Sequence, residues 1–85
     1  MYKVMLVDDE IWVLKNLMRI VDWSNYNMVV IATATDGIEA QNLIKENAPD
    51  VLITDLRMPG MDGLELIKRC RQLQPAAVCV ILSGS

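Results

Sequence analysis

Short apolar runs alternate with amphipathic stretches along this chain of 85 residues. Four runs are apolar at nearly every position, as expected of strands covered on both faces: Lys3 to Asp8, Met28 to Thr33, Val51 to Thr54 and Ala77 to Leu82. Between them, apolar residues recur three or four positions apart, which indicates helices. Strands that alternate with helices over short connections predict a parallel sheet with right-handed crossovers. The pattern therefore predicts an α/β fold in the order β-α-β-α-β-α-β, with helices in layers on both faces of the sheet.

The first predicted helix runs from Glu10 to Val21 and precedes a polar, turn-like segment from Asp22 to Asn27. Its apolar residues lie at helical spacing and predict one buried stripe along the helix: Ile11, Leu14, Leu17, Met18 and Val21.

Capping residues and prolines delimit the other two predicted helices. Asp36 is placed to cap the second helix, which Pro49 ends. Asp62 is placed to cap the third, and Glu65, three residues on, completes a pair that resembles a capping box. Pro75 closes this third helix.

Length and composition predict one small folded domain. A chain of 85 residues buries only about 60–65% of its unfolded surface. Hydrophobic residues nevertheless make up 53% of the chain and the mean hydropathy is +0.28, which excludes a disordered tail. The net charge of −3 gives no electrostatic footprint for nucleic acid. No stretch approaches the roughly 18 apolar residues of a membrane span.

The cysteine and histidine content narrows the possible chemistry. Cys70 and Cys79 show no metal-ligand spacing, so we interpret them as small buried hydrophobes of a reducing cytosol, with a disulfide as the alternative. The chain has no histidine, which excludes histidine-based acid–base catalysis. Because the N-terminus runs directly into a strand, we expect no signal peptide and a cytoplasmic location.

Three aspartates follow two of the apolar runs. Asp8 and Asp9 end the first run, and Asp55 ends the third. The carboxyl ends of parallel strands share one edge of the sheet, where ligands bind in open α/β folds. Three carboxylates there would repel one another by on the order of 4 kcal/mol per close pair at an effective dielectric of about 20. The pattern therefore predicts a hard cation such as Mg²⁺.

Each of these residues also has an ordinary structural interpretation. Asp8 and Asp9 are acids at the start of a helix, where the helix dipole favours them. Asp55 is a common type of turn residue, and Ser83 is a polar residue at the end of a strand. Taken one at a time, these interpretations are the simpler ones. The functional interpretation rests on all four falling at one edge of the sheet.

Together these motifs resemble the receiver domain of bacterial two-component response regulators, over all 85 residues. The resemblance implies the flavodoxin-like, doubly wound receiver fold. Its motifs in this chain are Leu6-Val7-Asp8-Asp9-Glu10, the loop Asp55-Leu56-Arg57-Met58-Pro59-Gly60-Met61-Asp62-Gly63, and Ile81-Leu82-Ser83-Gly84.

The resemblance also implies a role for each site residue. Asp55 would accept a phosphoryl group from a sensor histidine kinase. Asp8, Asp9 and Asp55 would bind Mg²⁺ together with the backbone carbonyl oxygen of Arg57. Ser83 would be the switch hydroxyl that turns toward the phosphoryl group. Such a domain is not an enzyme beyond catalysing its own phosphorylation and dephosphorylation.

The chain departs from the receiver pattern after its fourth strand. The family continues with a helix, a fifth strand, a lysine and a last helix, none of which follows Ser85 here. We therefore expect residues 1–85 to be the N-terminal part of a single receiver domain, with no second domain. Three segments resemble regulators whose receiver precedes an AraC-type DNA-binding domain: the Asp22-Trp23 turn, Arg57-Met58-Pro59-Gly60 and Leu82-Ser83-Gly84. This resemblance implies a transcription regulator that binds DNA through an output domain absent here.

Two other functions are compatible with the sequence. The uncovered apolar run Val78 to Leu82 favours a non-signalling module that associates through its fourth strand, as a homodimer that exchanges elements. A Mg²⁺-dependent phosphatase of the haloacid dehalogenase kind also uses an aspartate after a strand. It needs a second acid two residues later, and Arg57 stands at that position.

Overall fold

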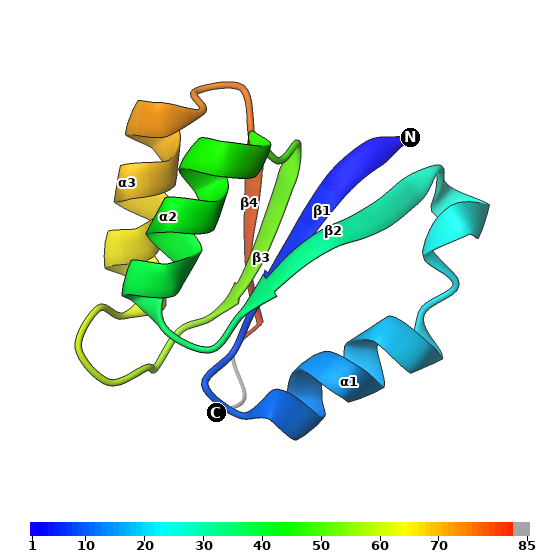
Figure 1. The fold of residues 1–85 in the computed structure, drawn as a ribbon, viewed down its shortest axis with the longest axis horizontal. Helices are drawn as coiled ribbons and strands as arrows, with labels where there is room; N and C mark the ends of the chain where they lie inside the picture. Colours follow the sequence, from blue (N-terminus) through cyan, green and yellow to red (C-terminus); the bar gives the residue numbers. More distant parts are fainter. Residues whose placement is uncertain (83–85) are drawn as a thin grey trace.

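The computed structural model describes residues 1–82 and contains a four-stranded sheet with helices on both faces (Figure 1). The strands are β1 (Tyr2–Val7), β2 (Met28–Ala34), β3 (Val51–Asp55) and β4 (Val78–Leu82). The helices are α1 (Ile11–Ile20), the short 3₁₀ helix η1 (Trp23–Tyr26), α2 (Gly37–Asn47) and α3 (Gly63–Leu73). Among these described residues, no helix is long and apolar enough to cross a bilayer.

The strands lie in the order β2-β1-β3-β4, and every neighbouring pair is parallel. Chain order and spatial order differ because β3 pairs with β1, on the side opposite β2. The predicted α/β, doubly wound parallel sheet is thereby confirmed. The fifth strand of the receiver pattern is not among the described residues.

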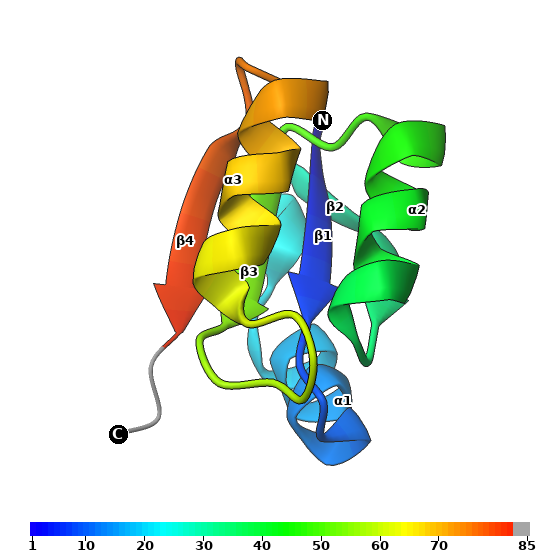
Figure 2. The same ribbon diagram turned by 90° about the vertical axis from the view of Figure 1, so that its left-hand side faces the viewer.

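The two faces of the sheet are covered unequally. Figure 2 shows α2 and α3 side by side over one face, while α1 lies on the other. The larger core cluster lies between the sheet and α2 and α3, and its largest fully buried members are Met5, Leu52, Ile44, Leu66 and Cys70. The smaller cluster, on the α1 side, has only three buried members, Val4, Leu6 and Leu14.

The caps predicted for α2 and α3 are present. The Asp36 carboxylate accepts a hydrogen bond from the backbone N–H of Glu39 at 2.8 Å, and Asp62 accepts one from Glu65 at 2.9 Å. These bonds satisfy N–H groups that have no partner within the helix. Both helices therefore begin within one residue of where the sequence places them.

The structure corrects two expectations about the segment after β1. Ile11 and Met18 were predicted to be buried, but they are 58% and 49% exposed. Only Leu14 of α1 is buried, because no second α-helix of residues 1–82 lies beside α1 on its face of the sheet. The segment predicted as a turn contains η1, whose Trp23 indole N–H donates to the carbonyl oxygen of Leu17 at 3.2 Å.

The strand β4 is an edge strand with one apolar face open to solvent. Cys79 and Ile81 are half-buried and alternate with three exposed residues, Val78, Val80 and Leu82. Side chains alternate between the faces of a strand, so the exposed set lies on the face that carries α1. The prediction of an apolar fourth strand without cover is confirmed for the described residues.

The amino ends of three strands are tied together at Asp50. Its carboxylate accepts a hydrogen bond from the backbone N–H of Lys3 at 2.7 Å, and its own N–H donates to the carbonyl oxygen of Lys3 at 2.8 Å. The carbonyl oxygen of Asp50 in turn accepts from the N–H of Val78 at 2.9 Å. Asp50 thereby links the starts of β1, β3 and β4 at the sheet edge opposite the aspartates.

Candidate functional site

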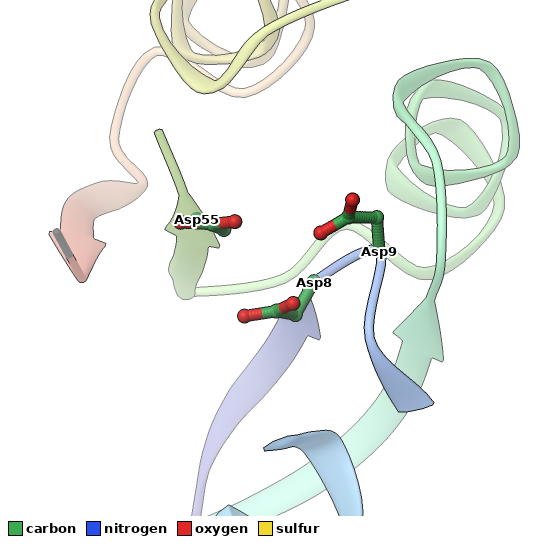
Figure 3. Close-up of side chains that lie close together, drawn as sticks. All are labelled: Asp8, Asp9 and Asp55. Carbon is green, nitrogen blue, oxygen red and sulfur yellow. The ribbon is translucent and has the colours of Figure 1, made fainter. Parts of the chain in front are cut away.

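Three carboxylates meet at the carboxyl ends of β1 and β3. Val7 is paired with Thr54 in the parallel register, so the residues that follow lie side by side, Asp8 just after β1 and Asp55 at the end of β3. Asp9 reaches the same space from the start of the loop to α1 (Figure 3). One carboxylate oxygen from each residue lies within 4.8 Å of the others. The structure therefore brings together the three aspartates that the sequence singled out.

The electrostatics of this cluster are most visible at Asp8. Partial burial raises the pKa of the Asp8 carboxyl, and the neighbouring charges of Asp55 and Asp9 raise it further. One contact opposes them, because the backbone N–H of Glu10 donates to the Asp8 carboxylate at 2.9 Å and lowers its pKa. The cluster without a cation therefore holds its negative charge at a cost in free energy.

A short chain of hydrogen bonds leads from this cluster to α1. The Glu10 residue that donates its N–H to Asp8 accepts, through its own carboxylate, a hydrogen bond from the indole N–H of Trp12. Trp12 is exposed, so its ring lies at the surface rather than in the core. An indole is thus connected to the acidic cluster through one intervening residue.

The backbone around Asp55 is held by its neighbours. The N–H of Leu56 donates to the Asp55 carboxylate at 2.9 Å. The hydroxyl of Thr54, which is fully buried, donates to the Asp55 carbonyl oxygen, also at 2.9 Å. The N–H of Gly63 donates to the carbonyl oxygen of Leu56 at 2.8 Å, which fastens the first turn of α3 to the end of β3.

Gly63 lies against the backbone of Asp55 more closely than any side chain would allow. A Cβ atom at Gly63 would stand 2.2 Å from the Asp55 carbonyl oxygen and 3.0 Å from the Leu56 Cα atom. The sequence reasoning gave Gly63 no role of its own. The available signal was a glycine at the first position of a predicted helix, directly after the capping residue Asp62.

The loop between β3 and α3 carries the remaining candidate residues. Arg57 is exposed two positions after Asp55, and Met58 is buried in the larger core cluster, which anchors the loop. Gly60 has a φ of +79°, a backbone conformation that residues with a Cβ atom rarely adopt. The predicted switch residue, Ser83, lies outside the described residues.

The donor set fits a hard divalent cation. All three ligand groups are carboxylates, and Mg²⁺ and Ca²⁺ both prefer oxygen ligands. Zinc sites usually include nitrogen or sulfur donors, which this cluster lacks. Within residues 1–82, it is the single cluster of acidic, histidine or cysteine side chains with metal-binding geometry.

Comparison with known proteins identifies the family of this chain. The family model of the response regulator receiver domain matches residues 4–85. The chain belongs to the response regulator receiver family. The resemblance that the motifs suggested is thereby confirmed.

Relatives of this receiver domain include transcription regulators. It is 42% identical over 84 residues to a protein of Bacillus subtilis named as the uncharacterised transcriptional regulatory protein YesN. The match covers 99% of this chain and 23% of YesN, so the chain spans about a quarter of that relative's length.

Solved receiver structures superimpose closely on this one. A two-component transcriptional regulator AraC from Clostridium phytofermentans matches with a TM-score of 0.94 at 34% identity, over 100% of this chain and 66% of that one. A CheX–CheY complex from Borrelia burgdorferi, crystallised with BeF₃ and Mg²⁺, matches with a TM-score of 0.86 at 28% identity. That match covers 99% of this chain and 63% of the other.

Proposed function

We propose that this receiver domain accepts a phosphoryl group on Asp55 from a sensor histidine kinase, with Mg²⁺ bound at the same site. The observation that carries the proposal is the gathering of three carboxylates within 4.8 Å at the ends of β1 and β3. Three carboxylates held this close repel one another, which costs free energy. A bound divalent cation would offset this repulsion and would also stabilise the charge of an incoming phosphoryl group. Membership of the receiver family supports a kinase as the donor.

The chemical step is a displacement at phosphorus. A carboxylate oxygen of Asp55 forms a bond to phosphorus while the bond from phosphorus to the donor's imidazole nitrogen breaks, and that nitrogen keeps the electron pair. The product is an acyl phosphate on Asp55. The N–H of Leu56 and the packing of Gly63 against the Asp55 backbone hold the nucleophile in place for this attack.

The other acids supply the cation site. We assign Asp8, Asp9 and Asp55 as carboxylate ligands and the backbone carbonyl of Arg57 as a fourth oxygen ligand. When bound, Mg²⁺ would offset the negative charge that builds on the transferring group. The Mg²⁺ in the structure of the CheY relative supports this choice of metal. Ser83 keeps its proposed role as the switch hydroxyl.

Two features favour a signalling domain over a phosphatase. A phosphatase of the haloacid dehalogenase kind needs a second acid two residues after its nucleophile, and Arg57 occupies that position. Arg57 is exposed, and we propose that its side chain instead controls the access of water to the acyl phosphate. The domain's own chemistry is therefore limited to gaining and losing its phosphoryl group.

The intact protein is proposed to regulate transcription. This follows from relatives named as transcription regulators, including the AraC protein of Clostridium phytofermentans. DNA binding would belong to an output domain outside the present 85 residues. The four strands and three helices described here would receive the signal.

The direct test is the intact mass of the protein after incubation with Mg²⁺ and phosphoramidate, a small phosphodonor. We expect an adduct of one phosphoryl group on the parent that hydroxylamine removes, because hydroxylamine cleaves acyl phosphates. The Asp55→Asn variant should gain no adduct. Omitting Mg²⁺ should abolish or greatly slow the labelling of the parent.

A matched control tests whether losing any surface carboxylate, rather than one in the acidic cluster, affects labelling. Glu46→Gln removes one exposed carboxylate of α2, away from the cluster, and should label like the parent. Equal labelling of Asp55→Asn and the parent would contradict the proposal. Turnover of a generic phosphate ester by the pure protein would favour the phosphatase instead.

One observation favours a second function, association of the chain with a copy of itself. Within residues 1–82, the apolar face of β4 formed by Val78, Val80 and Leu82 is exposed, and β4 is an edge strand, the kind of strand that can pair with another chain. Two copies would bury these faces against each other. This association is compatible with phosphorylation, because the acidic cluster lies on β1 and β3.

A further inference from the structure

The two cysteines lie on opposite sides of the tight turn that joins α3 to β4. The N–H of Gln74 donates to the carbonyl oxygen of Cys70 at 2.6 Å, and the N–H of Ala77 donates to that of Gln74 at 3.0 Å. Cys70 comes three residues before the end of α3, about 4.5 Å along the helix axis. Cys79 is the second residue of β4, about 3.3 Å beyond its start. The two side chains therefore lie at similar distances from the turn.

Both side chains face the same core. Cys70 is fully buried in the cluster between the sheet and α2 and α3. Cys79 is half-buried between the exposed residues Val78 and Val80, and it packs against that same cluster. The alternation of β4 thus turns the Cys79 thiol toward α3 and the Cys70 thiol. Within the sequence there are no other cysteines to compete for either of them.

We propose that Cys70 and Cys79 form an intramolecular disulfide that joins α3 to β4 when the protein meets a peroxide. Receiver chemistry at Asp55 does not require this bond, so the inference is independent of the proposed function. It assigns an oxidation site to a part of the fold away from the acidic cluster.

The proposed reaction has two steps. The Cys79 thiolate attacks hydrogen peroxide, the O–O bond breaks, and Cys79 becomes a sulfenic acid while the released hydroxide takes up a proton as water. The Cys70 sulfur then attacks the Cys79 sulfur, the S–O bond breaks, and the hydroxide leaves as water with the Cys70 proton. Overall, two thiols are oxidised, one peroxide is reduced, and two waters form.

The environments of the two thiols set this order. Burial, with a smaller contribution from the neighbouring Cys79 thiol, raises the pKa of the Cys70 thiol to about 12. A thiol that is buried and protonated reacts slowly with an oxidant in solution. Cys79 is the more accessible of the two and lies on an edge strand. Cys79 therefore reacts first, and Cys70 is the resolving thiol.

The bond would change what β4 is able to do. Cys79 lies near the start of β4, while Leu82, at its other end, is paired with Asp55. A covalent link at the start of β4 fixes its register against α3. The amides of β4 should then exchange with deuterium more slowly in the oxidised protein than in the reduced protein.

The test is oxidation of the folded protein with hydrogen peroxide, followed by denaturation, alkylation with iodoacetamide and measurement of intact mass. We expect a monomer two hydrogens lighter than the reduced protein, with neither cysteine alkylated. Dithiothreitol before alkylation should restore two alkylation sites. Two alkylated cysteines after oxidation, or disulfide-linked dimers in place of the monomer, would overturn the proposal.

Two single variants check the order of reaction. With oxidised glutathione as the probe, folded Cys70→Ser should gain one glutathione on Cys79, whereas folded Cys79→Ser should gain at least tenfold less in the same time. Equal uptake by both would contradict the assignment of Cys79 as the first thiol to react. Circular dichroism establishes that each variant is folded, and the result for the parent protein decides the disulfide by itself.

Discussion

The carboxyl group of Asp8 holds its proton more tightly in the folded chain than in the unfolded one. Burial and the charges of Asp55 and Asp9 raise its pKa above the ordinary value of 3.8. Between the unfolded and the folded pKa, the folded state therefore binds more protons. The free energy of unfolding therefore falls as the pH rises from the unfolded pKa of Asp8 to its folded pKa. Above the folded pKa, the ionised Asp8 carboxylate destabilises the folded state to its full extent.

The Asp8→Asn substitution should remove this cost. We expect the free energy of unfolding without metal to rise by on the order of 1 kcal/mol at pH 7 and to change little at a pH below the ordinary carboxyl pKa. Urea denaturation at the two pH values measures both. The same variant should bind Mg²⁺ more weakly, as seen by titration of tryptophan fluorescence. Equal free energies of unfolding for the variant and the parent at pH 7 would show that repulsion among the carboxylates does not destabilise the folded state.

Gly63 helps to position Asp55 through the close packing of their backbones. A methyl group at Gly63 would have to displace the Asp55 carbonyl oxygen, which lies 2.2 Å from the Cβ position. We expect Gly63→Ala to lower the free energy of unfolding by about 1–3 kcal/mol. Phosphoryl labelling of the folded variant should also slow at least tenfold, because Asp55, the proposed nucleophile, would move. Intact mass against time measures that rate.

Gly60→Ala is the matched control for this prediction. A Cβ atom at Gly60 has no neighbour within 4 Å, but its φ of +79° strains any residue other than glycine. It should therefore lose about 1 kcal/mol of stability and keep its labelling rate. If both variants label equally slowly, the effect belongs to loop stability rather than to the contact between Gly63 and Asp55.

Among the helices, α1 is held least firmly. It has no side-chain hydrogen bond at its N-cap and a single fully buried residue, Leu14. The helix α3 has the Asp62 cap and three buried residues. We expect the amides of α1 to exchange with deuterium at least tenfold faster than those of α3, because α1 opens at a lower free energy. Equal protection of the two helices in native-state exchange would contradict this.

Local rules predicted most of the elements but not how deeply they are buried. The caps Asp36 and Asp62 and the prolines fixed where α2 and α3 begin and end, because capping depends on residues a few positions apart. Burial of Ile11 and Met18 was predicted wrongly, since it depends on what lies beside α1 in space. The meeting of the aspartates was predictable from strand order, whereas the contact of Gly63 with Asp55 required the backbone coordinates.

At the scale of the whole molecule, the exposed apolar face of β4 is the surface through which we expect two copies of the chain to associate. Val80 is 38% exposed in the middle of that face, and Val29, on the opposite edge strand β2, is 39% exposed. We expect the parent to form dimers with rising concentration and Val80→Lys to remain monomeric, because a charge in the buried face is costly. Sedimentation velocity across a hundredfold range of concentration measures the distribution.

Val29→Lys is the control for that experiment, since it adds the same charge at an edge of similar exposure. It should dimerise like the parent if the interface is on β4. Loss of dimers in both variants would show that the interface is not confined to β4. A parent that is monomeric over the whole range would exclude self-association through β4.

The hydrogen bonds of Asp50 add to the strand pairing at one end of the sheet. Asp50 joins the starts of β1, β3 and β4, while the acidic cluster occupies the far ends of β1 and β3. The three strands are therefore tied together at the end away from the acidic cluster. At the near end, β1 and β3 are held by the pairing of Val7 with Thr54, next to the place where the phosphoryl group would sit.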